Sequence, residues 1–264
     1  MIKYIGVFAF LVGGFCHDFE TVISNQDPIV DGMRLVEGDM LFDDGPLFTE
    51  RNAVKYDQQL WPNGEIVYEI SPGLRQYEQI IREAMRTYED NTCIKFRRRT
   101  NEADYVNIHV GDRCYSRVGK SFRGGPQPLS LGRGCTDFGT ILHELGHSVG
   151  FDHEHSRADR DEFLIIHKEN IKNGSEHNFD KLWENNTRTI GPFDYDSIML
   201  YGAYAFSKDT RKFKTMEPVE PGLPMKSVIQ KGKLSYYDIV KVNKLYKCPP
   251  VNPYPGGIRP YVNV

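Results

Sequence analysis

The feature that most constrains this chain is a set of three histidines at fixed spacing, His143, His147 and His153. The apolar spacing over residues 138–149 predicts a helix, on which the first two imidazoles lie one turn apart on the same face. Gly150 adopts positive φ at little cost and is expected to end this helix. The chain can then turn so that the third imidazole approaches from another direction. Three neutral imidazoles leave a fourth coordination position open, as a catalytic zinc ion requires, so the spacing predicts one zinc site.

Glu144 directly follows the first predicted ligand, and its carboxylate can reach the open coordination position. Zinc lowers the pKa of a bound water, and a nearby carboxylate then accepts the proton, so the pattern indicates hydrolysis. The alternative is a secreted zinc-binding interaction protein without turnover. Retention of Glu144 argues against it, because zinc binding alone does not need that carboxylate. The other histidines are interpreted as ordinary core or surface residues: His17, His109, His155, His167 and His177.

The N-terminal region divides into two segments. Lys3, an apolar run over residues 5–12 and small residues after it predict a secretory signal over residues 1–16, too short to span a bilayer. Residues 17–50 hold nine acidic residues and one basic residue, a net charge of −8, without sustained periodicity. This charge fits either a solvated acidic segment or an extended acidic pro-segment over residues 17–51 that lies on a mildly basic enzyme. The whole chain has a net charge of −3 and no basic block with interleaved aromatics, which excludes a nucleic-acid partner.

Five cysteines are present, and Cys16 is expected to leave with the signal or just after it. An even number in an exported chain predicts two disulfides, with three pairings open from the sequence alone. The four that remain are Cys93, Cys114, Cys135 and Cys248. Two sequons predict glycosylation at Asn173 and Asn185.

Strand and helix patterns alternate in the first half of the chain. Thr136 and Asp137 are N-cap candidates for the histidine-bearing helix. Beyond Gly150 the chain is richer in Asn, Asp, Gly and Pro and is expected to be irregular, and residues 249–264 are a Pro- and Gly-rich tail. The expected strands span residues 65–70, 93–97, 105–110 and 129–131, and the other helices span 79–90 and 235–246.

The stretch from His143 to Asp161, with Glu154 directly after the third histidine, resembles the astacin family of the metzincin clan. The resemblance covers about residues 52–248. It implies an α+β, two-subdomain catalytic domain, with a twisted mixed five-stranded sheet and two long helices above the cleft and an irregular lower subdomain. It also implies a secreted, monomeric zinc endopeptidase made as a zymogen, with protein or peptide substrates and no membrane partner. A different metalloprotease family with the same metal ligands is the other alternative, and Glu154, Tyr201 and the cysteine spacing disfavour it.

Residues 197–201, Ser-Ile-Met-Leu-Tyr, resemble the family's Met-turn. The resemblance implies that Met199 forms a hydrophobic floor beneath the metal. It makes Tyr201 a switchable zinc ligand of the resting enzyme, which swings out to donate a hydrogen bond to the oxyanion. Leu200 stands where most members carry His.

The resemblance extends to the pro-segment, where Glu37-Gly38-Asp39 is similar to the family's aspartate switch, with Val36 in place of the usual Phe. Asp39 is then the zinc ligand of the zymogen, and the pro-segment is the enzyme's own inhibitor. Cleavage after Arg51 would create an amino terminus at Asn52, buried near Glu154. The implied disulfides are Cys93–Cys248 and Cys114–Cys135, and residues 105–110 would be the sheet edge where an extended substrate adds as an antiparallel strand.

Overall fold

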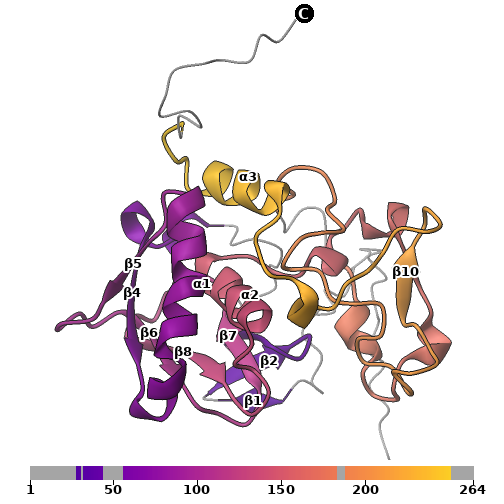
Figure 1. Cartoon of the computed structure of the whole chain (residues 1–264), viewed down its shortest axis with the longest axis horizontal. Coiled ribbons are helices and arrows are strands. Elements are labelled where there is room, and N and C mark those ends of the chain that lie inside the picture. Colours follow the sequence, from indigo (N-terminus) through magenta and orange to yellow (C-terminus); the bar gives the residue numbers. More distant parts are fainter. Residues whose placement is uncertain (1–27, 31, 44–55, 183–187, 251–264) are drawn as a thin grey trace, which may run out of the picture.

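The computed structural model describes residues 28–30, 32–43, 56–182 and 188–250. An eight-stranded mixed sheet carries α1 (Glu78–Asn91) and α2 (Phe138–Val149) on one face, and the irregular part of the chain after Gly150 lies beside this layer (Figure 1). A third helix, α3 (Tyr236–Leu245), closes the described fold. The predicted α+β architecture with a mixed sheet and two long helices is confirmed.

The strand order of the large sheet is β1-β2-β3-β7-β8-β6-β4-β5. The pairs β4–β5, β4–β6, β6–β8 and β3–β7 are parallel, whereas β7–β8, β1–β2 and β2–β3 are antiparallel. The strands are β1 (Ile29–Val30), β2 (Met33–Val36), β3 (Met40–Asp43), β4 (Glu65–Ile70), β5 (Lys95–Arg98), β6 (Tyr105–His109), β7 (Cys114–Arg117) and β8 (Pro126–Leu131). A separate two-stranded sheet pairs β9 (Leu164–Ile166) with β10 (Met216–Pro218).

The main core lies between the sheet and the two long helices. Apolar residues repeat at helical spacing in α1, which buries one stripe, whereas α2 is buried at every residue from Ile141 to Val149. Tyr88 of α1 donates a hydrogen bond to the carbonyl oxygen of Leu142 at 2.9 Å, which joins the two helices inside this core. Buried members include Ile66, Ile81, Met85, Ile108, Leu129, Ile141 and Leu145.

The helix α2 has the boundaries that the sequence predicts. Asp137 is the N-cap, and its side chain accepts a hydrogen bond from the backbone N–H of Thr140 at 2.9 Å. Gly150 follows the last helical residue with φ of 122°, a backbone conformation that a side chain would strain. The chain therefore leaves the helix sharply and returns His153 toward the helix.

Residues 33–43 differ from the sequence expectation, in which the predicted pro-segment is extended and unpacked. Residues 33–36 and 40–43 form the hairpin β2–β3, which widens the sheet beyond the five strands β4–β8 of the expected catalytic domain. The short apolar runs on either side of Glu37-Gly38-Asp39 are too brief to show a period, which is why the sequence did not reveal them. Val36 is buried against Met40.

The expectation that residues 105–110 form a sheet edge is wrong. Strand β6 has parallel partners on both sides, β4 and β8, so it has no free edge for a substrate. Strand β7 is instead the outermost strand of the catalytic part at that side of the sheet. Its edge is covered by β3, through the Ser116 N–H to the Asp39 carbonyl oxygen at 2.8 Å.

Two disulfides join distant parts of the fold. Cys93 lies before β5 and bonds to Cys248 after α3, and Cys114 of β7 bonds to Cys135 before α2. These are the two pairs that the resemblance implied. Among the described residues, no helix combines the length and the apolar character needed to cross a membrane.

Candidate metal centre

Three imidazoles converge at the exit of α2. The Nε2 atom of His143 lies 3.1 Å from that of His147 and 3.3 Å from that of His153. Nitrogens bound at zinc's usual distance in a tetrahedral site are separated by about 3.4 Å. All three rings are buried. The three nitrogens are therefore close enough to share a single ion.

The opposite ring nitrogens are each held by a hydrogen-bond acceptor. A donated Nδ1–H fixes the tautomer and leaves the Nε2 lone pair for a metal. The acceptors are the Ile198 carbonyl oxygen for His143 (2.8 Å), the Phe151 carbonyl oxygen for His147 (2.7 Å) and the Glu37 carboxylate for His153 (2.7 Å). Ile198 and Phe151 belong to the predicted catalytic domain, whereas Glu37 belongs to the predicted pro-segment.

Asp39 faces the three imidazoles and completes a four-residue donor set. Its carboxylate oxygens lie 3.2 Å from His143 Nε2, 3.6 Å from His147 Nε2 and 3.1 Å from His153 Nε2. Burial opposes ionisation, but the charge of His153 and hydrogen bonds from all three rings hold the pKa of Asp39 well below its usual value. The carboxylate is therefore an anion where a fourth zinc ligand would sit, and this donor set fits zinc.

Glu144 is 1% exposed, beside the metal-binding group. Burial, together with the Asp39 carboxylate, raises the pKa of Glu144 well above its usual value. Its Oε2 atom has no hydrogen-bond partner within the described part of the chain. A buried, unpaired carboxylate oxygen costs free energy unless a ligand meets it, so this atom fits a water or substrate at the metal.

Tyr201 lies over the same group from the Met-turn side. Its hydroxyl donates a hydrogen bond to Asp39 at 2.5 Å and lies 2.9 Å from the carbonyl oxygen of Glu37. The ring centroid is 4.2 Å from that of His153 and 4.9 Å from that of His155. Burial and nearby carboxylates raise the pKa of Tyr201 well above its usual value, so the phenol keeps its proton as a donor.

The Met-turn lies directly beneath α2. A Cβ at Gly146 would stand 2.5 Å from the sulfur of Met199 and 2.9 Å from the hydroxyl of Tyr88, so the glycine lets the turn approach the helix without displacing either side chain. Asp238 of α3 holds the turn by accepting from the Ser197 hydroxyl at 2.6 Å and the Ile198 N–H at 2.8 Å. Leu200 is fully buried in an apolar cluster that includes Phe193 and Met216, so its side chain serves packing.

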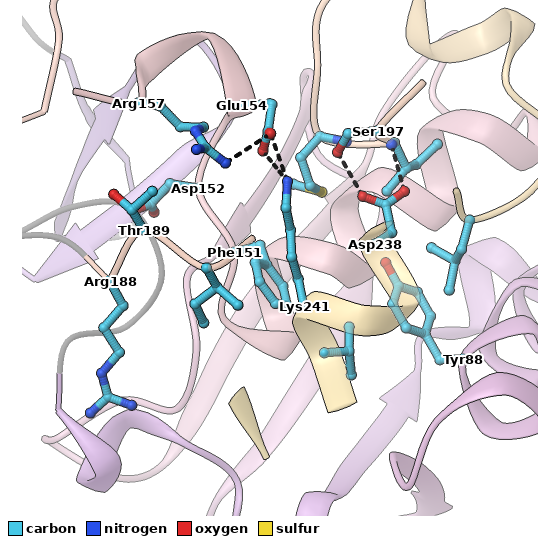
Figure 2. Close-up of a pocket in the computed structure, with 15 residues that line it drawn as sticks. Tyr88, Phe151, Asp152, Glu154, Arg157, Arg188, Thr189, Ser197, Asp238 and Lys241 are labelled. Carbon is cyan, nitrogen blue, oxygen red and sulfur yellow. Dashed lines mark hydrogen bonds and ion pairs between the residues drawn. The ribbon is translucent and has the colours of Figure 1, made fainter. Parts of the chain in front are cut away.

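Glu154, next to His153, is held by buried cations (Figure 2). The Nζ atom of Lys241 lies 2.6 and 2.7 Å from its two carboxylate oxygens, and Arg157 Nη1 lies 3.2 Å from Oε1. The Asp194 N–H donates to the same oxygen at 3.0 Å. Burial raises the pKa of Glu154 although both cations oppose that shift. This network fixes the segment that carries the third imidazole to α3.

We expect Lys241→Met to lower the free energy of unfolding by about 3 kcal/mol, because it leaves a buried carboxylate with one cation instead of two. Urea unfolding of the disulfide-intact protein measures this loss. Lys244→Met, an exposed position on the same helix, is the matched control and should change stability by less than about 0.5 kcal/mol. Equal stabilities for the two variants would contradict the role of Lys241.

Sequence reasoning missed four polar residues of this region. Glu37 and His155 are buried beside the metal-binding group. Burial lowers the pKa of His155 to about 3, so this imidazole is uncharged. Asp238 and Lys241 share a helical face with the apolar Val242, and that spacing was the available signal that both are buried.

Several predicted sites lie outside the described residues: the signal, Arg51, Asn52, Asn185 and nearly all of the tail. Asn173 is exposed.

The mixed sheet, the three converging imidazoles and the buried carboxylate beside them define a zinc metallopeptidase. Residues 53–247 match the family model described as Astacin, a peptidase family. The chain belongs to the astacin family, and it is a zinc-dependent endopeptidase.

Curated relatives and a solved structure agree with this assignment. The chain is 87% identical over 159 residues to astacin-like metalloprotease toxin 5 of Loxosceles gaucho, covering 60% of this chain and 86% of that protein. It is 42% identical over 253 residues to astacin-like metalloprotease toxin 2 of Loxosceles intermedia, covering 94% and 98%. High choriolytic enzyme 1, a hatching enzyme zinc-protease of Oryzias latipes, superposes with a TM-score of 0.68 at 39% identity, covering 75% of this chain and all of that one.

Proposed function

We propose that the processed chain cleaves internal peptide bonds with zinc held by His143, His147 and His153 and with Glu144 as general base. The observation that carries this proposal is the convergence of three Nε2 atoms beside a buried carboxylate that has an unpartnered oxygen. When bound, zinc would polarise the scissile carbonyl and lower the pKa of a coordinated water.

Glu144 takes the proton from the attacking water and passes it to the leaving amine. Burial raises the pKa of this carboxylate above its usual value, which favours its acceptance of a proton. Tyr201 keeps its phenolic proton and, once Asp39 has left, can donate a hydrogen bond to the oxyanion. No covalent bond to the protein forms in this sequence of proton transfers.

In the uncut chain, the pro-segment acts as inhibitor. Asp39 takes the fourth ligand position, and Glu37 binds His153 Nδ1 and accepts from the Ser156 hydroxyl at 2.6 Å. Strand β3 also covers the edge of β7. Cleavage after Arg51 then releases the site. The new amino terminus at Asn52 lies near Glu154, whose carboxylate already contacts the buried ammonium of Lys241.

Substrates bind as an extended strand along β7, antiparallel to it. Strand addition satisfies the exposed backbone groups of a sheet edge and presents alternate side chains to the protein. Strand β3 pairs with β7 in the parallel sense, so the pro-segment uses the same edge in the orientation opposite to that of a substrate.

The chain is exported, with a signal over residues 1–16 and glycosylation at Asn173 and Asn185. The toxin relatives and the two disulfides support an extracellular protein. The processed enzyme works as a monomer, because the site is complete within one chain.

Chelation of the metal from the processed protein should abolish hydrolysis of an unstructured protein such as casein, and added Zn²⁺ should restore it. Casein cleavage with and without 1,10-phenanthroline measures this effect. Undiminished cleavage after zinc has been removed, shown by metal analysis, would contradict a zinc peptidase. A zinc-loaded processed chain that cleaves nothing would favour the non-enzymatic alternative.

A further inference from the structure

A buried lysine, Lys231, binds the backbone of the Met-turn. It is 6% exposed. Its ammonium donates hydrogen bonds to the carbonyl oxygens of Ser197 and Leu200, each at 2.6 Å. The Leu200 N–H also donates to the Ser197 carbonyl oxygen at 3.1 Å, which makes residues 197–200 one turn. A single ammonium therefore bridges the first and last carbonyl groups of that turn.

The charge of Lys231 has its counterpart on the other side of the turn. Asp238 of α3 accepts a hydrogen bond from the Ser197 hydroxyl at 2.6 Å (Figure 2). Burial lowers the pKa of Lys231 to about 8, whereas the charges of Asp238 and Asp194 oppose this shift, so the amine keeps its proton at neutral pH. A buried ammonium costs free energy unless its N–H groups find acceptors, and this one finds them in the turn. The turn is thus held by a cation and an anion.

The backbone that carries Lys231 is closely packed. A Cβ at Gly139 of α2 would stand 2.6 Å from the Lys231 carbonyl oxygen. A Cβ at Gly202, the residue after Tyr201, would stand 2.7 Å from the Cα of Ser227. The segment 227–231 therefore has little room to shift relative to α2 or to the end of the Met-turn, and it gives the ammonium a fixed support.

Tyr201 directly follows a carbonyl group that Lys231 binds. The peptide bond between Leu200 and Tyr201 is planar, so a fixed Leu200 oxygen also fixes the direction of the Tyr201 N–Cα bond. The phenolic hydroxyl lies at the far end of the side chain, where it donates to Asp39 in the uncut chain. A rotation of that peptide plane would therefore displace the hydroxyl from the metal-binding group.

We propose that Lys231 is a positioning residue that holds Tyr201 where its hydroxyl can donate to the oxyanion. This inference rests on the proposed function and adds the group that sets the place of the tyrosine. Lys231 does not line the cavity beside the metal-binding group, so its effect on turnover passes through the turn. His143 uses the same turn, through the Ile198 carbonyl oxygen at 2.8 Å, so zinc content is measured in every variant.

The test is a double-mutant cycle on kcat with the processed, zinc-loaded enzyme at neutral pH. Lys231→Met keeps the length of the side chain but removes its donors. It should lower kcat for a fluorogenic peptide by about tenfold or more and change KM by less than about threefold. In a Tyr201→Phe background, which lacks the phenolic donor, the same substitution should lower kcat by less than about threefold. Equal losses in both backgrounds are expected of a purely structural role and would overturn the inference.

The matched control is Lys233→Met, an exposed position close in the chain, which should keep wild-type kcat. If Lys231→Met does not fold, Lys231→Gln, which retains an amide donor, is taken through the same cycle. Failure of both variants to fold would show that Lys231 supports the whole domain, and loss of zinc would show that it acts through His143. Either result overturns the inference.

Tyr201→Phe alone separates this inference from the proposed function, and it should lower kcat by about 100-fold. A wild-type kcat in that variant would remove Tyr201 from the proposed mechanism, and the inference about Lys231 would fall with it. A large loss in Tyr201→Phe, combined with equal effects of Lys231→Met in the two backgrounds, would overturn the role of Lys231 alone.

Discussion

Glu144→Gln in the processed enzyme is expected to lower kcat/KM for peptide hydrolysis by about 10³-fold or more, with one zinc ion still bound per chain. The amide keeps the volume of the carboxylate in a site that is 1% exposed, but it cannot accept the proton of the attacking water. Peptide kinetics and metal analysis on the same preparation measure the two quantities.

The matched control for this variant is Glu169→Gln, which makes the same chemical change at a side chain that is 72% exposed. It should retain wild-type kcat/KM. If the Glu144 variant hydrolysed peptides within a few-fold of wild type, Glu144 would not be the general base. If it instead lost its zinc, the loss of activity would reflect metal binding rather than proton transfer.

Asp39→Ala is expected to activate the uncut chain by about 100-fold or more, because the competing fourth ligand is lost. The measurement is made in an Arg51→Gln background, which blocks the expected processing site and keeps the pro-segment attached. Hydrolysis of a fluorogenic peptide by this double variant is compared with hydrolysis by Arg51→Gln alone.

Glu162→Ala in the same background removes an exposed carboxylate and should leave the uncut chain as inactive toward the peptide as Arg51→Gln alone. If the Asp39→Ala variant stayed inactive with zinc bound and the fold intact, Asp39 would not be the main inhibitory contact. The remaining candidates would then be Glu37, which holds His153, and β3, which covers the edge of β7.

Local chemistry made much of the site predictable. The helix over residues 138–149 follows from its apolar spacing, its Asp137 cap and its Gly150 stop, and these are properties of consecutive residues. The helix by itself brings His143 and His147 to one face, so two of the three ligands could be placed without a tertiary contact. His153 needed only the sharp turn at Gly150.

Contacts between distant segments could not be read in the same way. Lys241 and Glu154 are 87 positions apart, and Glu37 and His153 are 116 apart. Charged side chains are usually solvated, so neither pair was expected to be buried. The assignment of the substrate edge to residues 105–110 failed for the same reason, because strand order depends on pairing between segments and not on the pattern of any one strand.

The amino-acid sequence by itself predicted the three histidines, the carboxylate beside them and the helix that carries two of these histidines, because spacing and capping act within a few residues. The fold class followed from the resemblance to a family. Only the tertiary structure decided that the pro-segment joins the sheet, that β7 is the strand it covers, and that Lys241 supports Glu154. Those features arise where burial removes water from groups far apart in the chain, and the free energy of such pairing depends on the packed surroundings.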